Sequence, residues 1–137
     1  MQLIVFRLRE HLYGFTTENI EEITPVLKEA PIPQSPSWVR GLINLRGQIM
    51  TLLDLDVLLN GFSPSQELWY TNTVIVNTED NPIAFMTGKV IGVTDIEPEE
   101  IQSVEDSSLI TGYVEAYNEL VNIIDVHSIL KEKEELS

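Results

Sequence analysis

The sequence predicts an all-β protein with a few short helices, built as two roughly five-stranded β-barrel subdomains. Its apolar runs are short, closely spaced and separated by turn-forming residues, as in small barrels and sandwiches. The sequence also repeats itself without gaps at an offset of 71 residues, and equivalent positions keep their apolar or polar character. We therefore expect residues 1–137 to form a single domain made of two similar, intimately packed β-subdomains. The matching positions are Gly41 with Gly112, Asp54 with Asp125, Leu59 with Leu130, Leu3–Val5 with Val74–Val76, and Ile20 with Ile91.

The first elements follow from local patterns. Gln2–Leu8 and Leu12–Phe15 are predicted strands around a turn, so the chain opens with a hairpin. Thr17–Glu22 reads as a short helical turn, with Thr16 or Thr17 as its cap. Ile23–Leu27 is extended again. Three prolines then exclude a helix and set a rigid connector toward the centre of the chain: Pro31, Pro33 and Pro36.

A central hairpin follows the connector. The apolar runs Leu42–Leu45 and Ile49–Leu53 flank Arg46-Gly47-Gln48, where glycine permits the positive φ that a tight turn needs. Arg46 is the only basic residue between Arg40 and Lys89. An isolated guanidinium at a turn is either a solvated tip or a bidentate anchor for a carboxylate. The residues alone favour the solvated tip.

The elements after the hairpin are assigned in the same way. Asp54 caps a predicted helix that reaches Leu59 and stops at Asn60-Gly61, before a polar joint over Gly61–Glu67. The second half offers three strands and a short acidic helix: Thr71–Val76, Ile83–Met86, Val90–Val93 and Pro98–Gln102. It ends with a hairpin around Tyr117-Asn118 and a capped helix: Ile110–Val114, Leu120–Ile124, and Asp125 onward to Glu135.

Composition narrows the functional classes. A chain that is 43% hydrophobic is too apolar for disorder, and no apolar run approaches the ~20 residues that span a bilayer. The formal charge of −14 has the wrong sign for binding nucleic acid or anionic lipid. With no cysteine and no signal peptide we expect a cytoplasmic protein, without membrane insertion and without a thiolate or Cys-based zinc site.

Candidate catalytic and metal sites fail on inspection. His127-Ser128 has no nucleophile elbow, Gly88-Lys89 is no phosphate loop, and His11 and His127 share no ligand spacing. We expect no catalytic residue, no cofactor and no metal. Asp54-Leu55-Asp56 leaves open a small carboxylate-dependent enzyme or cation-binding protein, but Asp54 is better explained as a helix cap. Core packing is likewise the favoured explanation for four aromatic residues: Trp38, Trp69, Tyr70 and Tyr113.

The central hairpin resembles the signature of the CheW family of chemotaxis coupling proteins. The matching block is residues 39–49, Val-Arg-Gly-Leu-Ile-Asn-Leu-Arg-Gly-Gln-Ile. Further matches extend the resemblance over about Leu3–Leu130: Tyr13-Gly14, Ile20–Ile23, Val90–Val93, Glu97–Ile101 and Leu120–Asp125.

This resemblance implies two small barrels around a shared apolar seam and a non-enzymatic adaptor. Such an adaptor joins the cytoplasmic tip of a chemoreceptor to the C-terminal regulatory domain of a CheA-type histidine kinase. By position, Arg46 matches the family's functional arginine and Glu22 the acid that pairs with it, fixing the hairpin tip relative to the first helix. The resemblance places five further residues in the receptor-facing groove: Ile20, Gly41, Asn44, Leu45 and Gly47.

Some positions depart from the family pattern. Thr51 stands where a proline is usual, and Thr87-Gly88 replaces an apolar-acidic step. These departures leave open a divergent scaffold for a non-flagellar pathway, such as surface motility. Because the chain ends soon after the resemblance does, we expect a stand-alone adaptor that is monomeric when isolated. The remaining alternative to an adaptor is a structural subunit that associates with further copies of itself.

Overall fold

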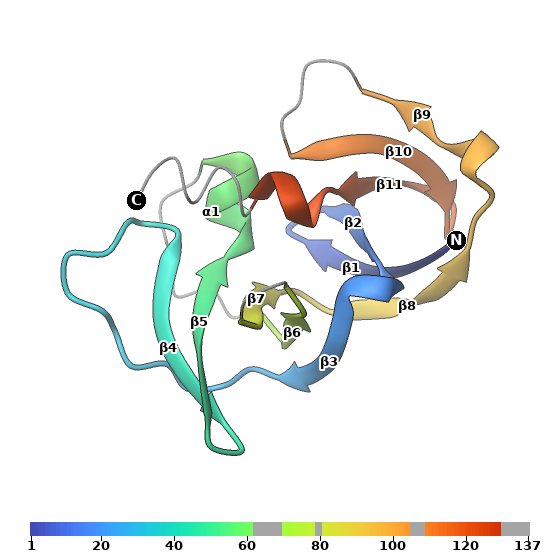
Figure 1. Cartoon of the computed structure of the whole chain (residues 1–137). Helices are drawn as coiled ribbons and strands as arrows, with labels where there is room; N and C mark the ends of the chain where they lie inside the picture. Colours follow the sequence, from blue (N-terminus) through green and yellow to red (C-terminus); the bar gives the residue numbers. More distant parts are fainter. Residues whose placement is uncertain (62–69, 79–80, 105–108, 130–137) are drawn as a thin grey trace. The chain divides into compact units, whose positions relative to one another are not determined.

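The computed structural model describes residues 1–61, 70–78, 81–104 and 109–129, and it is built mainly of β-strands (Figure 1). The first half contains five strands, a 3-10 turn and one helix: β1 (Gln2–Leu8), β2 (His11–Thr16), η1 (Thr17–Asn19), β3 (Ile20–Pro25), β4 (Val39–Leu45), β5 (Gln48–Asp54) and α1 (Leu55–Asn60). The second half contains β6 (Asn72–Val76), β7 (Ile83–Thr87), β8 (Val90–Asp95), η2 (Pro98–Glu100), β9 (Gln102–Ser103), β10 (Ile110–Ala116) and β11 (Glu119–Ile124). A helical turn follows over residues 126–129.

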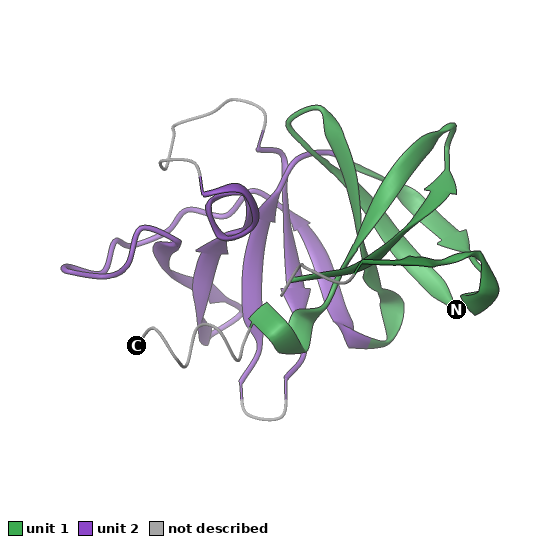
Figure 2. Cartoon of the chain, turned by 90° about the horizontal axis from the view of Figure 1, so that it is seen from above, with its two compact units in different colours: residues 1–18, 90–137 green, residues 19–89 purple. Residues whose placement is uncertain are grey.

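The strands form two sheets, one in each of two compact units (Figure 2). Unit 1 comprises Met1–Glu18 and Val90–Ser137 and holds six strands in the order β8-β1-β2-β11-β10-β9. Unit 2 comprises Asn19–Lys89 and holds five strands in the order β3-β6-β7-β5-β4. Neighbouring strands run antiparallel except for one parallel pair in each sheet, β2 with β11 and β5 with β7. The mainly β fold class and the two sheets of five and six strands agree with the sequence prediction.

The two sheets are equivalent strand for strand. The order β3-β6-β7-β5-β4 of unit 2 corresponds to β8-β1-β2-β11-β10 of unit 1, and one row of paired residues can be followed across each sheet. In unit 2 this row is Gly41, Leu52, Ala84, Ile75 and Glu22. In unit 1 it is Gly112, Ile123, Gly14, Val5 and Gly92. The internal repeat is therefore present in the structure.

The registers correct the gapless alignment of the repeat. Strands β4 and β5 match β10 and β11 at the expected offset of 71 residues, because Gly41 pairs with Leu52 as Gly112 pairs with Ile123. The earlier strands are offset by 70 residues, so Val5 corresponds to Ile75 and not to Val76. By the same offset Ile20 corresponds to Val90 and not to Ile91. The second half therefore has one residue more than the first half in the segment that precedes β10. Insertions there are tolerated better than inside strands.

Each unit also takes strands from both halves of the sequence. Unit 1 combines the β1–β2 hairpin of the first half with β8 to β11 of the second, and unit 2 combines β3 to β5 with the β6–β7 hairpin. The two compact units therefore do not coincide with the two sequence repeats. The physical reason is the length of the link between β2 and β3.

Each unit has its own apolar core. In β4 and β10 alternate residues are buried, as the period of two along a strand requires, whereas β1, β2, β6 and β7 each bury four consecutive residues. The core of unit 1 consists of Leu3, Val5, Leu12, Ile96, Val114, Val121 and Ile123. The core of unit 2 consists of Ile43, Met50, Leu52, Tyr70, Ile75, Ala84 and Met86.

Most predicted elements are present, with two helical segments corrected. The acidic helix expected over Pro98–Gln102 ends with η2 at Glu100, and Gln102 begins β9. The helical turn expected over Thr17–Glu22 is confined to η1, and Ile20 begins β3. Strand β3 pairs with β6 along its whole length, and the β-branched Ile20 and Ile23 suit a strand better than a helix. The polar joint and the end of the last helix fall largely or wholly outside the described residues. In the described part of the chain, no helix is long and apolar enough to cross a membrane.

Candidate functional site

The tip of the β4–β5 hairpin is a two-residue turn. Leu45 and Gln48 form the last strand pair, and Arg46 and Gly47 between them have φ angles of 53° and 86°. Two consecutive positive φ angles are typical of a type I′ turn, whose twist matches that of the strands. The side chain of Asn44 adds a local restraint, because its Oδ1 accepts a hydrogen bond from the Gly47 N–H at 2.9 Å.

Arg46 binds Glu22 in a bidentate ion pair. Its Nη1 donates to Oε1 and its Nη2 to Oε2, each at 2.6 Å. The side chain of Arg46 is 70% exposed and that of Glu22 is 29% exposed. The hydrogen bonds from Arg46 lower the pKa of Glu22 below its ordinary value, and Glu22 in turn raises the pKa of Arg46. The solvated tip that the residues alone favour is therefore wrong, and the pairing implied by the family resemblance is present.

The ion pair joins opposite edges of the unit 2 sheet. Glu22 lies on β3, and Arg46 lies at the tip of the hairpin whose strand β4 forms the other edge. The three strands between these edges belong to the same sheet, so the two side chains close its open side. We call this Arg46–Glu22 pair the ionic clasp. It fixes the hairpin tip relative to β3, and not relative to a helix as expected.

The outer face of the hairpin exposes apolar side chains beside the clasp. Leu42 is opposite Thr51 and Asn44 is opposite Ile49, and directly opposed residues share a face of the sheet. Leu42 is 38% exposed and Ile49 is 57% exposed. The opposite face of the same hairpin carries Ile43 and Met50 into the core. We call Leu42, Asn44, Ile49 and Thr51 the outer hairpin face.

The structure brings most of the candidate site residues together. Arg46 binds Glu22, and within the same turn the Gly47 N–H donates to Oδ1 of Asn44. Leu45 is half-buried and packs against the unit 2 core, and Ile20 is half-buried on β3, two residues before Glu22. The ionic clasp is thus made by two of these six residues, and the other four lie next to it or within two residues of it along the chain.

Gly41 lies apart from the other candidate site residues and is buried. Its φ is +149°, and a Cβ atom there would lie 2.3 Å from the carbonyl oxygen of Ala30. Ala30 crosses over β4 at this point and exchanges two backbone hydrogen bonds with Leu42, of 2.8 and 2.9 Å. Glycine at position 41 therefore allows the connector to cross the strand closely. Its expected role in a groove stays a prediction.

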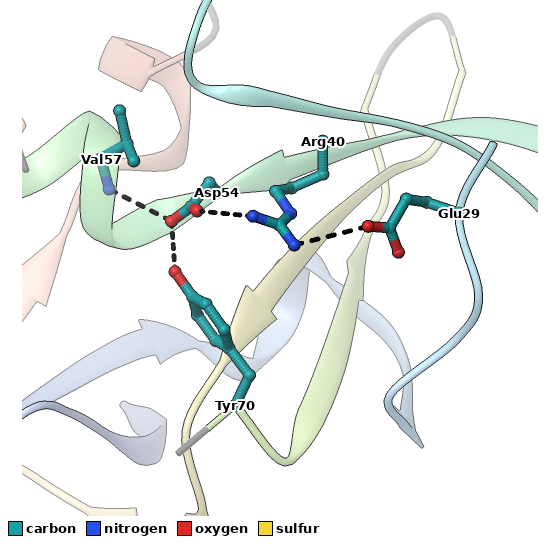
Figure 3. A network of polar contacts seen from close by, with 5 residues as sticks. All are labelled: Glu29, Arg40, Asp54, Val57 and Tyr70. Atoms are coloured by element: carbon teal, nitrogen blue, oxygen red, sulfur yellow. Dashed lines mark hydrogen bonds and ion pairs between the residues drawn. The ribbon is translucent and has the colours of Figure 1, made fainter. Parts of the chain in front are cut away.

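A buried polar network that sequence reasoning missed holds the other end of the hairpin (Figure 3). The carboxylate of Asp54 is completely buried and accepts hydrogen bonds from the Val57 N–H at 3.2 Å and from the Tyr70 hydroxyl. Its Oδ2 lies 3.8 Å from Nη1 of Arg40, whose Nη2 lies 3.4 Å from Oε1 of Glu29. Burial, together with the Asp54 carboxylate, raises the pKa of Tyr70.

This network fixes the roles of the two candidate carboxylates. Asp54 caps α1 as expected, and it also binds an arginine and a tyrosine. Asp56 is buried and its Oδ1 accepts from Nδ2 of Asn60 at 2.8 Å. Protein donors thus occupy Oδ1 of Asp54, and Oδ2 faces the Arg40 guanidinium, whose charge disfavours a cation there. Within the described ranges, no group of three or more His, Asp or Glu side chains is placed to hold a metal ion.

The remaining sequence candidates are placed as follows. Trp38 and Tyr70 are buried, in agreement with core packing, Tyr113 is half-buried, and Trp69 lies outside the described residues. Asp125 accepts hydrogen bonds from the N–H groups of His127 and Ser128 at 3.0 and 3.3 Å, so it caps the last helical turn as predicted. A sequence signal for the Arg40 network is hard to find, because Arg40 and Tyr70 are far apart along the chain.

Comparison with known proteins finds similarity over almost the whole chain. The family model of the CheW-like domain matches residues 2–134. The chain is 28% identical over 142 residues to the chemotaxis protein CheW of Treponema pallidum, a match that covers 97% of this chain and 84% of that protein. It is 25% identical over 135 residues to the chemotaxis protein CheW of Thermotoga maritima, covering 96% and 88%.

A solved structure extends the comparison to the fold. The scaffolding protein CheW of Thermoanaerobacter tengcongensis matches with a TM-score of 0.83 at 22% sequence identity. The match covers 93% of this chain and 86% of that one. At this level of identity the likeness establishes a common fold.

Proposed function

The chain belongs to the family of CheW-like domains, and we propose that it is a non-enzymatic adaptor coupling chemoreceptors to a CheA-type histidine kinase. Its relatives are scaffold and chemotaxis proteins. The observation that carries the proposal is the ionic clasp. It holds Arg46 in one orientation at the tip of an exposed hairpin, where the family resemblance expects a functional arginine.

The chemistry of the outer hairpin face supports docking of a helical partner. Leu42 and Ile49 offer exposed apolar area beside Arg46, and apolar area supplies most of the affinity in helix-in-groove recognition. The guanidinium sits at the end of this face, where it sets the register of the partner more than its affinity. The partners that fit are the cytoplasmic tip of a chemoreceptor and the C-terminal regulatory domain of the kinase. The protein would act in the cytoplasm and reach membrane receptor arrays through these partners.

A retention experiment with a matched control tests the proposal. We would immobilise wild type, Arg46→Ala and Arg7→Ala and identify the proteins retained from a detergent extract of the source cells. Arg7 is the matched control, because it forms a bidentate pair with Glu119 in unit 1 at 3.4 and 2.8 Å. We expect wild type and Arg7→Ala to retain a chemoreceptor or a CheA-type kinase, and Arg46→Ala to retain about tenfold less, which corresponds to ~1.4 kcal/mol of binding free energy.

The Glu22→Ala variant sharpens the test. If Glu22 acts by orienting Arg46, its removal weakens retention, and the double variant retains no less than Arg46→Ala alone. Retention of neither a receptor nor a kinase by the folded wild type contradicts the coupling function. Equal retention by all variants contradicts the role of the clasp.

Three other functions predict different outcomes. A scaffold for a non-flagellar pathway is favoured by Thr51 and by Thr87-Gly88, and it predicts retention of a receptor-kinase system dedicated to surface motility. Self-association would appear as a dimer or larger species in gel filtration with light scattering, where the adaptor is expected to be a monomer. A cation-binding protein would gain thermal stability on addition of Ca²⁺ or Mg²⁺. The partners of Asp54 argue against it.

A further inference from the structure

The β10–β11 hairpin of unit 1 ends in the same kind of turn as the β4–β5 hairpin. Ala116 and Glu119 form its last pair, and Tyr117 and Asn118 between them have φ angles of 54° and 61°. By the offset of 71 residues, Tyr117 occupies the position of Arg46. Asn118 replaces Gly47, as asparagine tolerates the left-handed region better than other side chains.

The residue that faces this turn is equivalent to Glu22. Glu22 pairs with Ile75 on β6, and Gly92 pairs with Val5 on β1, at the same place in the two equivalent rows. A Cβ atom built on Gly92 would lie 2.9 Å from the hydroxyl oxygen of Tyr117 and 3.8 Å from its Cζ. Apart from Gly92 itself and its two chain neighbours, no other described residue has an atom within 4 Å of that point. The hydroxyl end of the Tyr117 side chain therefore reaches from the hairpin tip to β8 and lies against the glycine.

We propose that Tyr117 and Gly92 form a second clasp, which closes the six-stranded sheet as Arg46 and Glu22 close the five-stranded one. Strand β8 forms an edge of the unit 1 sheet, and the tip of β10–β11 reaches it across the open side. The two clasps occupy equivalent positions but differ in chemistry. The first clasp is a pair of charged side chains, and the second is a tyrosine side chain that contacts a glycine. We call the second one the aromatic clasp.

This difference lets the two hairpin tips respond separately to solution conditions. The ionic clasp lies at the surface, so salt screens its attraction. Contact between a tyrosine ring and backbone does not depend on charge. Salt should therefore loosen the β4–β5 tip and leave the contact between Tyr117 and Gly92 in place, although it also screens the part-exposed Arg7–Glu119 ion pair beside the β10–β11 turn. The inference is independent of the proposed function, because it concerns only how each tip is held.

A double-variant cycle tests the aromatic clasp. Gly92→Ala places a methyl group 2.9 Å from the hydroxyl oxygen and must displace the ring. Tyr117→Phe removes that oxygen, and the nearest remaining atom is then 3.8 Å away, an ordinary contact. We expect Gly92→Ala to speed amide hydrogen exchange at the β10–β11 tip by about fivefold. In the Tyr117→Phe background the same change should have almost no effect.

The outcomes of this cycle are unambiguous. Equal acceleration in both backgrounds, or no acceleration in either, overturns the aromatic clasp. Tyr117→Ala serves as a second variant if Gly92→Ala fails to fold. It should speed exchange at the β10–β11 tip and leave exchange at the β4–β5 tip unchanged.

Salt separates the two clasps once the Arg7–Glu119 pair at the β10–β11 tip is removed by Arg7→Ala. In that background, raising NaCl to about 1 M shortens the Debye length to ~3 Å and should speed exchange at the β4–β5 tip only. The Arg46→Ala variant should show fast exchange at that tip at low salt and no further response. An equal salt response of both tips would show that they are not held by different chemistry.

Discussion

Both terminal nitrogens of Arg46 meet carboxylate oxygens of Glu22 at 2.6 Å, although most of the arginine side chain is exposed. An exposed pair of this kind contributes little to folding, because water and salt screen it and two long side chains lose conformational freedom. What it provides is orientation, since the planar guanidinium matches a carboxylate along two parallel hydrogen bonds. A lysine at position 46 could keep the charge but not this geometry.

Glu22 should titrate below its ordinary pKa of 4.5 because Arg46 stabilises its charged form. Its stabilising contribution is therefore present above the unfolded-state pKa and is lost as the pH falls through the lowered folded-state pKa. Carbon-detected NMR titration of the Glu22 carboxyl group would measure this midpoint. In Arg46→Ala the midpoint should return toward 4.5, whereas Arg7→Ala should leave it unchanged. A midpoint that Arg46→Ala does not move would contradict the ionic clasp.

At the scale of the element, Asp54 and Asp125 occupy equivalent positions where a strand passes into a helix, but their surroundings differ. Asp125 is half-buried, and among the described residues its side chain accepts hydrogen bonds from the first helical turn, from two backbone N–H groups and from the Ser128 hydroxyl at 2.8 Å. Asp54 is fully buried and also binds Tyr70 and Arg40. Substitutions of Asp125 and Asp54 can therefore be compared to separate what a helix cap contributes to stability from what the buried network contributes.

Asp125→Ala should lower the free energy of unfolding by about 1 kcal/mol, the usual cost of losing a cap. Asp54→Ala should cost about 3 kcal/mol or more, because it also leaves the Tyr70 hydroxyl without its acceptor and removes the buried carboxylate that faces Arg40. Urea unfolding followed by tryptophan fluorescence would measure both, and Tyr70→Phe should fall between them. Equal costs for the two aspartate variants would mean that the network adds nothing to the cap.

The sequence predicts those elements whose causes are local. Both type I′ turns, the two capping aspartates and the stop of α1 at Gly61 depend on residues within a few positions of one another. Local residues predict a helical turn over the first part of β3, because the strand is stabilised by pairing with β6, about 50 positions away along the chain. The network around Arg40 escaped prediction for the same reason. The Arg46–Glu22 pair became visible only through the family resemblance.

At the scale of the whole molecule, the short link between β2 and β3 determines which strands share a unit. If the first half folded alone in the observed order, β3 would take the place beside β1 and run parallel to β2. Such a connection must return along the length of a strand, ~20 Å, and usually needs a dozen or more residues. Only η1, three residues long, joins the two strands, and it spans at most ~14 Å from Thr16 to Ile20. The third strand must therefore pass into the other unit.

The same argument applies to the second half, where only Gly88 and Lys89 separate β7 from β8. Neither half can then complete a sheet alone, although each carries nearly all the strand types of one unit. We expect a fragment of residues 1–65 and a fragment of residues 66–137 to lack dispersed amide NMR spectra when studied separately. Mixed in equal amounts, they should give a spectrum close to that of the intact chain, because each supplies the hairpin that the other sheet requires. A folded spectrum from either fragment alone would mean that β3 can pair with β1, or β8 with β6, in spite of the short links.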